Sequence, residues 1–148
     1  MGVVVHLPGE GEQIGVGSSS SVTIKATGKD TAGSFYLGEA VIEPGYAAPP
    51  PHIHERHHNI FYVLEGTLTL RIGDETLDLG RGLFACIPPG IVHTFSNSSE
   101  QPVRFLVFDT PAAGSENRLR DLAAAHAAGS LTLEEHVQIS SRYDWRVA

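Results

Sequence analysis

The feature that most constrains the fold is a series of short β-type runs separated by glycine-containing turns. The runs occupy residues 34–42, 59–65, 67–72, 75–79, 83–87, 91–96 and 103–109, with a further strand expected near residues 22–26. The turns at Glu65-Gly66 and Gly73-Asp74 supply glycines that can take positive φ where neighbouring strands reverse. Seven or eight strands at this spacing predict an all-β antiparallel barrel or sandwich.

The segments on either side of these strands have different patterns. Residues 1–21 are rich in glycine and serine, and we expect an irregular, flexible arm there, followed by a barrel over about residues 22–110. Beyond residue 110 the apolar period changes from two to about 3.6, which predicts a helix that ends near Gly129. Thr132 and Glu135 have the spacing of a capping box and predict the start of a second helix. We therefore expect one domain over residues 1–148, with two short helices in a tail of about residues 115–148 that covers the barrel or a subunit contact and carries no chemistry.

Charge and cysteine content exclude several classes of function. The net charge is -7, and the ten basic residues are scattered, so nucleic acid is not an expected partner. Cys86 is the single cysteine, which excludes an intrachain disulfide and favours a cytoplasmic location with a buried, inert thiol. Apolar runs are much shorter than the roughly 20 residues that span a bilayer, so no membrane segment is expected.

Histidines cluster in the middle of the chain. Four of the eight, His52, His54, His57 and His58, lie within seven residues. His52 and His54 project from the same face of an extended strand, so both rings can reach one metal ion. A third ligand from this segment requires a bend, and His93, which follows the turn Pro88-Pro89-Gly90, can add a ligand from another strand.

Two segments resemble the two motifs of the cupin superfamily. The first runs from Gly45 through His52-Ile53-His54 to the segment at residues 61–66, and the second contains Gly82, Pro88-Pro89-Gly90, His93 and Asn97. The resemblance implies a double-stranded β-helix, or jelly-roll barrel, that holds one divalent metal ion. It also implies a homodimer.

One departure from the cupin pattern affects the expected ligands. The glutamate that usually supplies a ligand is replaced by Asn59, and His58 stands one position earlier. This spacing resembles the small cupins whose metal is held by four histidines, so we assign His52, His54, His58 and His93 as ligands. His57 remains an alternative to His58, and Asn59 is a possible weak oxygen ligand.

A set of four neutral imidazoles would leave a divalent ion with its full charge, which favours Lewis-acid over redox chemistry. We expect zinc with water in its open positions as the catalytic group, and iron, manganese and nickel remain alternatives. A pocket lined by inward apolar side chains would accept a flat, hydrophobic, oxygen-bearing substrate. The candidate lining residues are Phe35, Leu37, Phe61, Val63, Phe84, Phe95 and Val107.

Among cupins, the pattern is most similar to the aromatic polyketide cyclases of antibiotic biosynthesis, including the cyclase of the resistomycin pathway. That resemblance implies a lyase-type, metal-dependent enzyme that closes a ring of a polyketide intermediate by aldol addition and dehydration. One alternative is a quercetinase-like dioxygenase that cleaves a flavonol or diketone. The other is a non-catalytic cupin that binds a small molecule. For the enzyme, the expected partner is a small polyketide- or flavonoid-like substrate.

Overall fold

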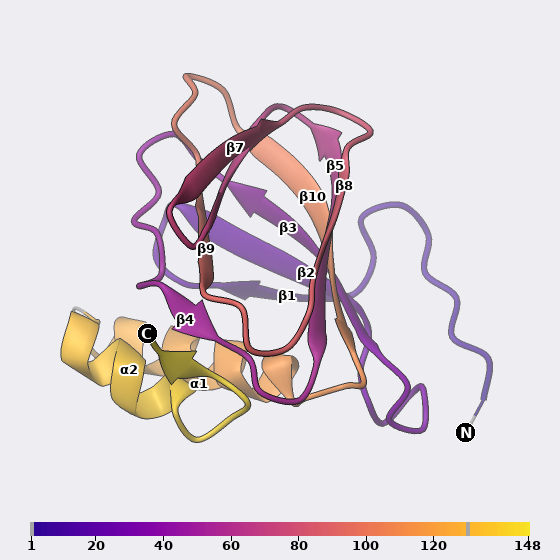
Figure 1. Ribbon diagram of the computed structural model, residues 1–148. Helices are drawn as coiled ribbons and strands as arrows, with labels where there is room; N and C mark the ends of the chain where they lie inside the picture. The colour runs from indigo at the N-terminus through magenta and orange to yellow at the C-terminus, as the bar shows by residue number, and fades with distance from the viewer. Residues whose placement is uncertain (1, 130) are drawn as a thin grey trace.

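Alternating buried and exposed residues build two antiparallel β-sheets with the core between them (Figure 1). The computed structural model describes residues 2–129 and 131–148. The larger sheet has the order β1-β2-β3-β10-β5-β8, with β1 at Glu12–Gly15, β2 at Ser20–Ala26, β3 at Tyr36–Ile42, β10 at Val103–Thr110, β5 at His58–Glu65 and β8 at Phe84–Ile87. The smaller sheet has the order β11-β4-β9-β6-β7, with β11 at Arg146–Val147, β4 at His52–Ile53, β9 at His93–Ser96, β6 at Leu68–Ile72 and β7 at Glu75–Leu79.

The core is formed by the inward faces of both sheets. Phe61, Phe105 and Ile42 contribute from the larger sheet, and Leu68 and Leu70 contribute from the smaller sheet. Burial on β3 alternates strictly, as expected for a strand with one face on the core.

The predicted all-β jelly roll with two C-terminal helices is confirmed. Each strand expected from the sequence is present, with ends that differ by at most two residues. The pairing of the described residues forms two sheets rather than one closed barrel. The expectation of an irregular arm is wrong for residues 12–15, because β1 pairs with β2 there.

The two helices lie together at the end of the jelly roll where β4 and the C-terminus are found (Figure 1). Helix α1, Ser115–Ala128, packs through Leu119 and Ala123 on a small cluster that contains Ile14 and Tyr36. Helix α2, Leu133–Ser140, begins with the predicted capping box. Neither helix has the length and apolar character needed to cross a bilayer.

Candidate metal centre and cavity

Three histidines, carried by two neighbouring strands of the smaller sheet and the residue that follows one of them, converge on one point. His52 on β4 is directly paired with His93 on β9, and His54 follows β4 on the same face as His52. All three side chains are buried, and their ligand nitrogens lie within 4.8 Å of one another. The structure thus brings together three of the four histidines assigned from the sequence.

Main-chain carbonyl groups fix the orientation of each ring. The Nδ1 atoms lie 2.8 Å from the oxygen of Pro50 for His52, 2.7 Å from that of Asp144 for His54, and 2.9 Å from that of Ile91 for His93. A carbonyl oxygen can only accept, so each Nδ1 must carry the proton and donate it. Each Nε2 is then left with a free lone pair, which is the state a metal ligand needs.

Burial also keeps these three rings neutral. Desolvation, together with the neighbouring His93, lowers the pKa of His52 to about 2, and desolvation with the nearby His57 lowers the pKa of His54 to about 4. The pKa of His93 is also lowered, chiefly by burial. All three are therefore unprotonated at neutral pH and available for coordination.

Asn59 completes the cluster with an oxygen atom. Its amide nitrogen donates to the Asp109 carboxylate at 2.8 Å, which directs its Oδ1 towards His93 Nε2 at 3.2 Å. Neither of these two facing atoms carries a proton if His93 donates from Nδ1 to Ile91. A group of three bare imidazole nitrogens and one amide oxygen contains only acceptors, so it could hold a divalent cation.

The structure does not bring His58 to this cluster, which corrects its assignment as the fourth ligand. His58 is the first residue of β5 and is exposed. Along β5 the buried side chains are those of Asn59, Phe61 and Val63, so the pleat directs His58 to the opposite face. Asn59 takes the position expected for His58.

His57, the alternative fourth ligand, lies in a buried ionic network beside the cluster. Its Nδ1 is 2.7 Å from Asp144 Oδ2, and its Nε2 is 3.4 Å from Asp109 Oδ1. Burial alone would lower the pKa of His57, but the two carboxylates outweigh it and raise that pKa. The two carboxylates therefore favour the protonated form of His57, in which neither ring nitrogen has a lone pair for a metal ion.

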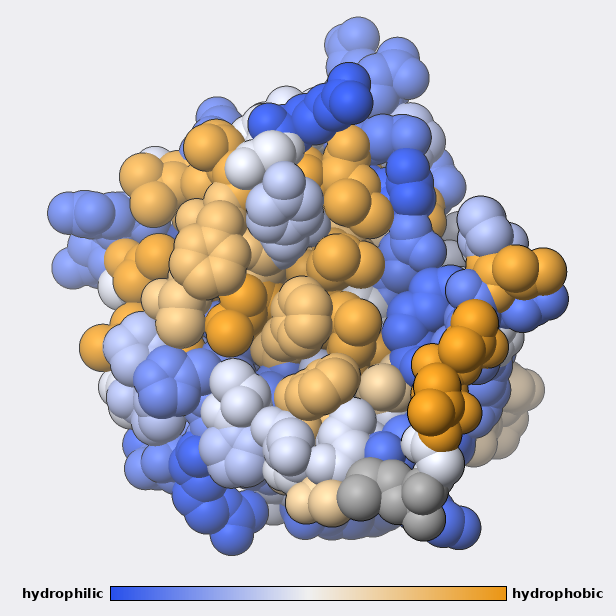
Figure 2. All heavy atoms as spheres, turned by 90° about the vertical axis from the view of Figure 1, so that its right-hand side faces the viewer, coloured by the Kyte–Doolittle hydropathy of each residue, from blue (hydrophilic) through white to orange (hydrophobic). Residues whose placement is uncertain are grey.

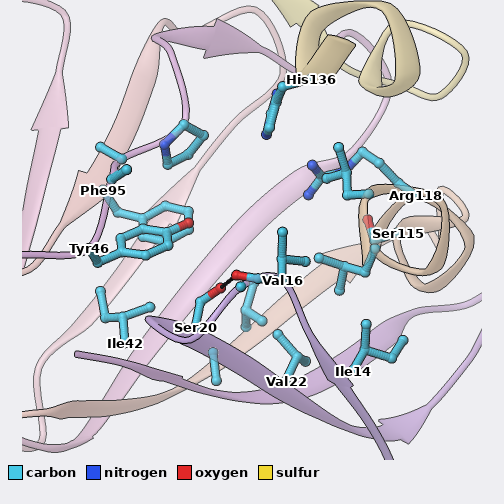
Figure 3. Close-up of a pocket in the computed structure, with 18 of the residues that line it drawn as sticks. Ile14, Val16, Ser20, Val22, Ile42, Tyr46, Phe95, Ser115, Arg118 and His136 are labelled. Carbon is cyan, nitrogen blue, oxygen red and sulfur yellow. Dashed lines mark hydrogen bonds between the residues drawn. The ribbon is translucent and has the colours of Figure 1, made fainter. Parts of the chain in front are cut away.

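The histidine cluster opens into a cavity of about 500 Å³. The walls include Phe61, Phe105 and Trp145, and Tyr46 stacks on Phe95 at a ring-centroid distance of 5.8 Å (Figure 3). Asp109 is the sole carboxylate among the described residues that line this cavity. A cavity of this size and character accommodates a hydrophobic small molecule with a few polar groups.

Comparisons with known proteins establish the family. Residues 38–109 match the cupin domain family. The polyketide cyclase RemF from Streptomyces resistomycificus is 31% identical, with 74% of this chain and 80% of that chain covered and a TM-score of 0.61. The chain is a cupin.

Two further relatives of this cupin are more distant or shorter matches. KdgF from Halomonas sp. has a TM-score of 0.66 over 78% of this chain and 99% of that chain, but at 20% identity it shows the fold alone. An uncharacterized protein from Aquifex aeolicus is 36% identical over 67 residues, which are 45% of this chain. The match spans only 55% of that relative's own length.

Three of the seven residues expected to line the pocket of the cupin lie in the wall of the cavity. Phe61, Phe95 and Val107 line the cavity. Phe35 and Leu37 do not, because β3 turns the alternate residues from Tyr36 to Ile42 inward. Val63 is buried in the core away from the cavity, and Phe84 is 62% exposed on β8.

The C-terminal tail of the cupin contributes to the site, contrary to the expectation that it carries no chemistry. Trp145 stacks on His52 at 5.0 Å, and the Asp144 carboxylate accepts from the backbone amides of Glu55 and Arg56 at 2.9 Å each. The tail also places Arg118 in the cavity wall. The sequence gives no signal for these roles, because the contacts of Asp144 join residues almost ninety positions apart.

The thiol of Cys86 is exposed on β8, which corrects the prediction that it is buried. Cys86 shares the outward face of β8 with Phe84, because residues two apart on a strand point to the same side.

Proposed function

We propose that this cupin is a metal-dependent cyclase that promotes aldol-type ring closure and dehydration of an aromatic polyketide intermediate. The observation that carries the proposal is a cluster of neutral histidines that opens into an apolar cavity with the carboxylate of Asp109 in its wall. The similarity to the polyketide cyclase RemF supports the substrate class.

His52, His54 and His93 would hold the ion, and Asn59 Oδ1 would add a neutral oxygen. A bound divalent ion, zinc in this proposal, supplies Lewis acidity that polarises a carbonyl group, and a neutral ligand set leaves its charge undiminished. Iron, manganese and nickel are the alternatives that metal analysis distinguishes.

The walls of the cavity hold the chain of the substrate and exclude water. Ring closure joins two carbons that are distant along a flexible polyketone, so the reaction gains from a container that restricts the chain to a folded conformation. The stacked pair Tyr46 and Phe95, together with Phe61 and Trp145, supplies flat apolar surfaces for this purpose.

Asp109 is positioned to accept the proton that aldol closure removes from a carbon next to a carbonyl. Burial would raise its pKa, but the ion pair with His57 outweighs burial and lowers that pKa, so the carboxylate is ionised at neutral pH. Its oxygens are held by Ser115 and by Asn59. After accepting the proton, the same carboxyl group can return it to the oxygen that leaves as water.

Elemental analysis of the purified protein and turnover of a poly-β-ketone substrate, with and without oxygen, test this proposal. We expect about one zinc ion per chain and an oxygen-independent product lighter by water. Strict dependence on oxygen would instead identify a dioxygenase, and binding without turnover would identify a binding protein. An Asp109→Asn variant should keep its zinc and lose turnover by roughly a hundredfold or more.

A further inference from the structure

Arg118 on α1 places a positive charge in the cavity wall, and no carboxylate oxygen of the described residues lies within ion-pair distance of it. Its guanidinium makes one long hydrogen bond, from Nη1 to Ser140 Oγ at 3.4 Å. Four arginines nearer the surface, Arg56, Arg104, Arg120 and Arg146, each have a carboxylate oxygen within 4.0 Å, whereas Arg118 has none among the described residues. A partly desolvated guanidinium stays charged and needs an anionic partner, and the cavity is where one can reach it.

A second polar group, His136 on α2, lies near Arg118. Both side chains point into the cavity, one from each helix (Figure 3). The Nδ1 atom of His136 is buried and has no hydrogen-bond partner. Tyr36 lines the same cavity and is only 1% exposed, and its hydroxyl is also buried without a hydrogen-bond partner. The helix side of the cavity thus contains a cation and two unsatisfied polar groups.

This helix side is separate from the histidine cluster. His136 packs on Trp145 at a ring-centroid distance of 5.4 Å, and the other neighbour of that indole is His52, at 5.0 Å. One ligand can therefore touch the metal centre with one end and Arg118 with the other, while its apolar body lies between them.

We infer that Arg118 and His136 form a subsite for a carboxylate group of the substrate. A planar guanidinium matches the two oxygens of a carboxylate, and a single cation balances a single negative charge. A phosphate dianion fits less well, because Asp109 lines the same cavity and repels additional negative charge. The inference rests on the proposed function only where it names the substrate. On that basis, the substrate is an aromatic or polyketide carboxylic acid.

Calorimetric titration of the metal-free protein with 2-naphthoate and with its neutral carboxamide tests the subsite. Metal is removed so that the probe's carboxylate cannot coordinate an ion. Wild-type protein should bind 2-naphthoate at least about tenfold more tightly than the carboxamide, as expected for a charge-assisted pair. Arg118→Met should abolish this preference, whereas Arg118→Lys should retain part of it. Arg120→Met, on the same helix but paired with Glu12 at the surface, is the matched control and should behave as wild type.

The inference is overturned if wild-type protein fails to bind 2-naphthoate, binds both probes equally, or keeps the preference in a folded Arg118→Met variant. Thermal melting of each variant establishes that it is folded. The proposed function fails separately, since a protein that prefers the carboxylate but does not cyclise a polyketide has the subsite without the cyclase activity. Turnover of a neutral polyketone by a protein that shows no preference for 2-naphthoate over its carboxamide would support the cyclase and remove the subsite.

Discussion

At the scale of single residues, the candidate ligands differ from the other histidines in what holds their rings. Each of His52, His54 and His93 donates from Nδ1 to a main-chain carbonyl, which presents Nε2 to a shared point. His58 lies only four positions after His54 in the sequence but is exposed, with its side chain on the opposite face of β5. Position in the strand, rather than closeness in the sequence, therefore selects the ligands.

Single substitutions distinguish the candidate metal ligands from His58. His93→Ala should reduce the zinc content from about one ion per chain to a small fraction, because it removes one of three imidazole ligands. His58→Ala should leave the zinc content unchanged. Inductively coupled plasma mass spectrometry after dialysis measures both, and loss of zinc from a folded His58→Ala variant would restore the four-histidine assignment.

At the scale of elements, strand parity explains both the success and the failure of sequence reasoning. The regular runs around Leu70 and Phe105 are long enough for the alternation to be visible, so the strands were predictable. In β5, Phe61 and Val63 point inward. Asn59 is an even number of positions from both and also points inward, whereas His58 points outward. β4 and β11 have two residues each, which is too short for a period to show. Their pairing, and the tail's approach to the ligand loop, depend on tertiary contacts.

The C-terminal segment that leads into β11 organises the loop of residues 54–57. Asp144 alone makes four contacts there, through its carbonyl to His54 and through its carboxylate to two backbone amides and to His57. The buried carboxylate has a lowered pKa, because these hydrogen bonds outweigh the effect of burial. It therefore remains an acceptor for all of its partners at neutral pH.

Asp144→Ala should weaken zinc binding by about 10–100-fold, because it removes the support that orients the His54 loop without removing a ligand. Competition with a fluorescent zinc chelator measures the affinity. Arg146→Ala is the matched control, since Arg146 forms only an exposed ion pair with Glu55 and should change the affinity little. Equal affinities for the two variants would show that the Asp144 contacts do not support the metal centre.

At the scale of the whole molecule, the buried histidines make stability depend on pH. Folding lowers the pKa of His52, His54, His93 and His136, the last to about 4 through burial and the charge of Arg118. Between about pH 4 and 6.5 the unfolded chain therefore binds more protons at these sites, and the free energy of unfolding falls as the pH falls. His57, whose pKa is raised, acts in the opposite direction: its stabilisation is complete below pH 6.5 and is lost as the pH rises through its folded pKa.

Folding lowers the pKa of four histidines and raises that of one, so we predict that the metal-free protein becomes less stable as the pH falls. Its melting temperature should fall by at least about 5 °C between pH 7 and pH 5. Differential scanning calorimetry in the presence of a chelator measures this change. A melting temperature that stays constant or rises over this interval contradicts the neutral, buried state of the histidines. Zinc should steepen the dependence, because protons compete with the metal for the same nitrogens.

The outer face of the larger sheet presents an apolar surface on the side away from the cavity. Figure 2 shows hydrophobic residues gathered there, beside the N-terminal arm. Tyr62, Leu83 and Phe84 are 39%, 47% and 62% exposed, and Val3 and Val5 of the arm are 93% and 78% exposed. Neighbouring outward residues on β5 and β10 include Ile60, Leu106 and Phe108. A continuous apolar patch of this kind marks an interaction surface, and a second copy of the same chain is the partner that we propose, through a two-fold interface.

Phe84→Glu tests this interface, because it places a charge on the edge strand of the apolar face. Wild-type protein should elute with twice the chain mass of 15.8 kDa in size-exclusion chromatography with light scattering, and the variant should elute as a monomer. Leu77→Glu, at a position 43% exposed on the smaller sheet, is the control and should remain a dimer. The zinc content of both variants should equal that of wild type, since neither position lines the cavity. A monomeric wild-type protein at micromolar concentration, or a dimeric Phe84→Glu variant, would assign this face to a different partner.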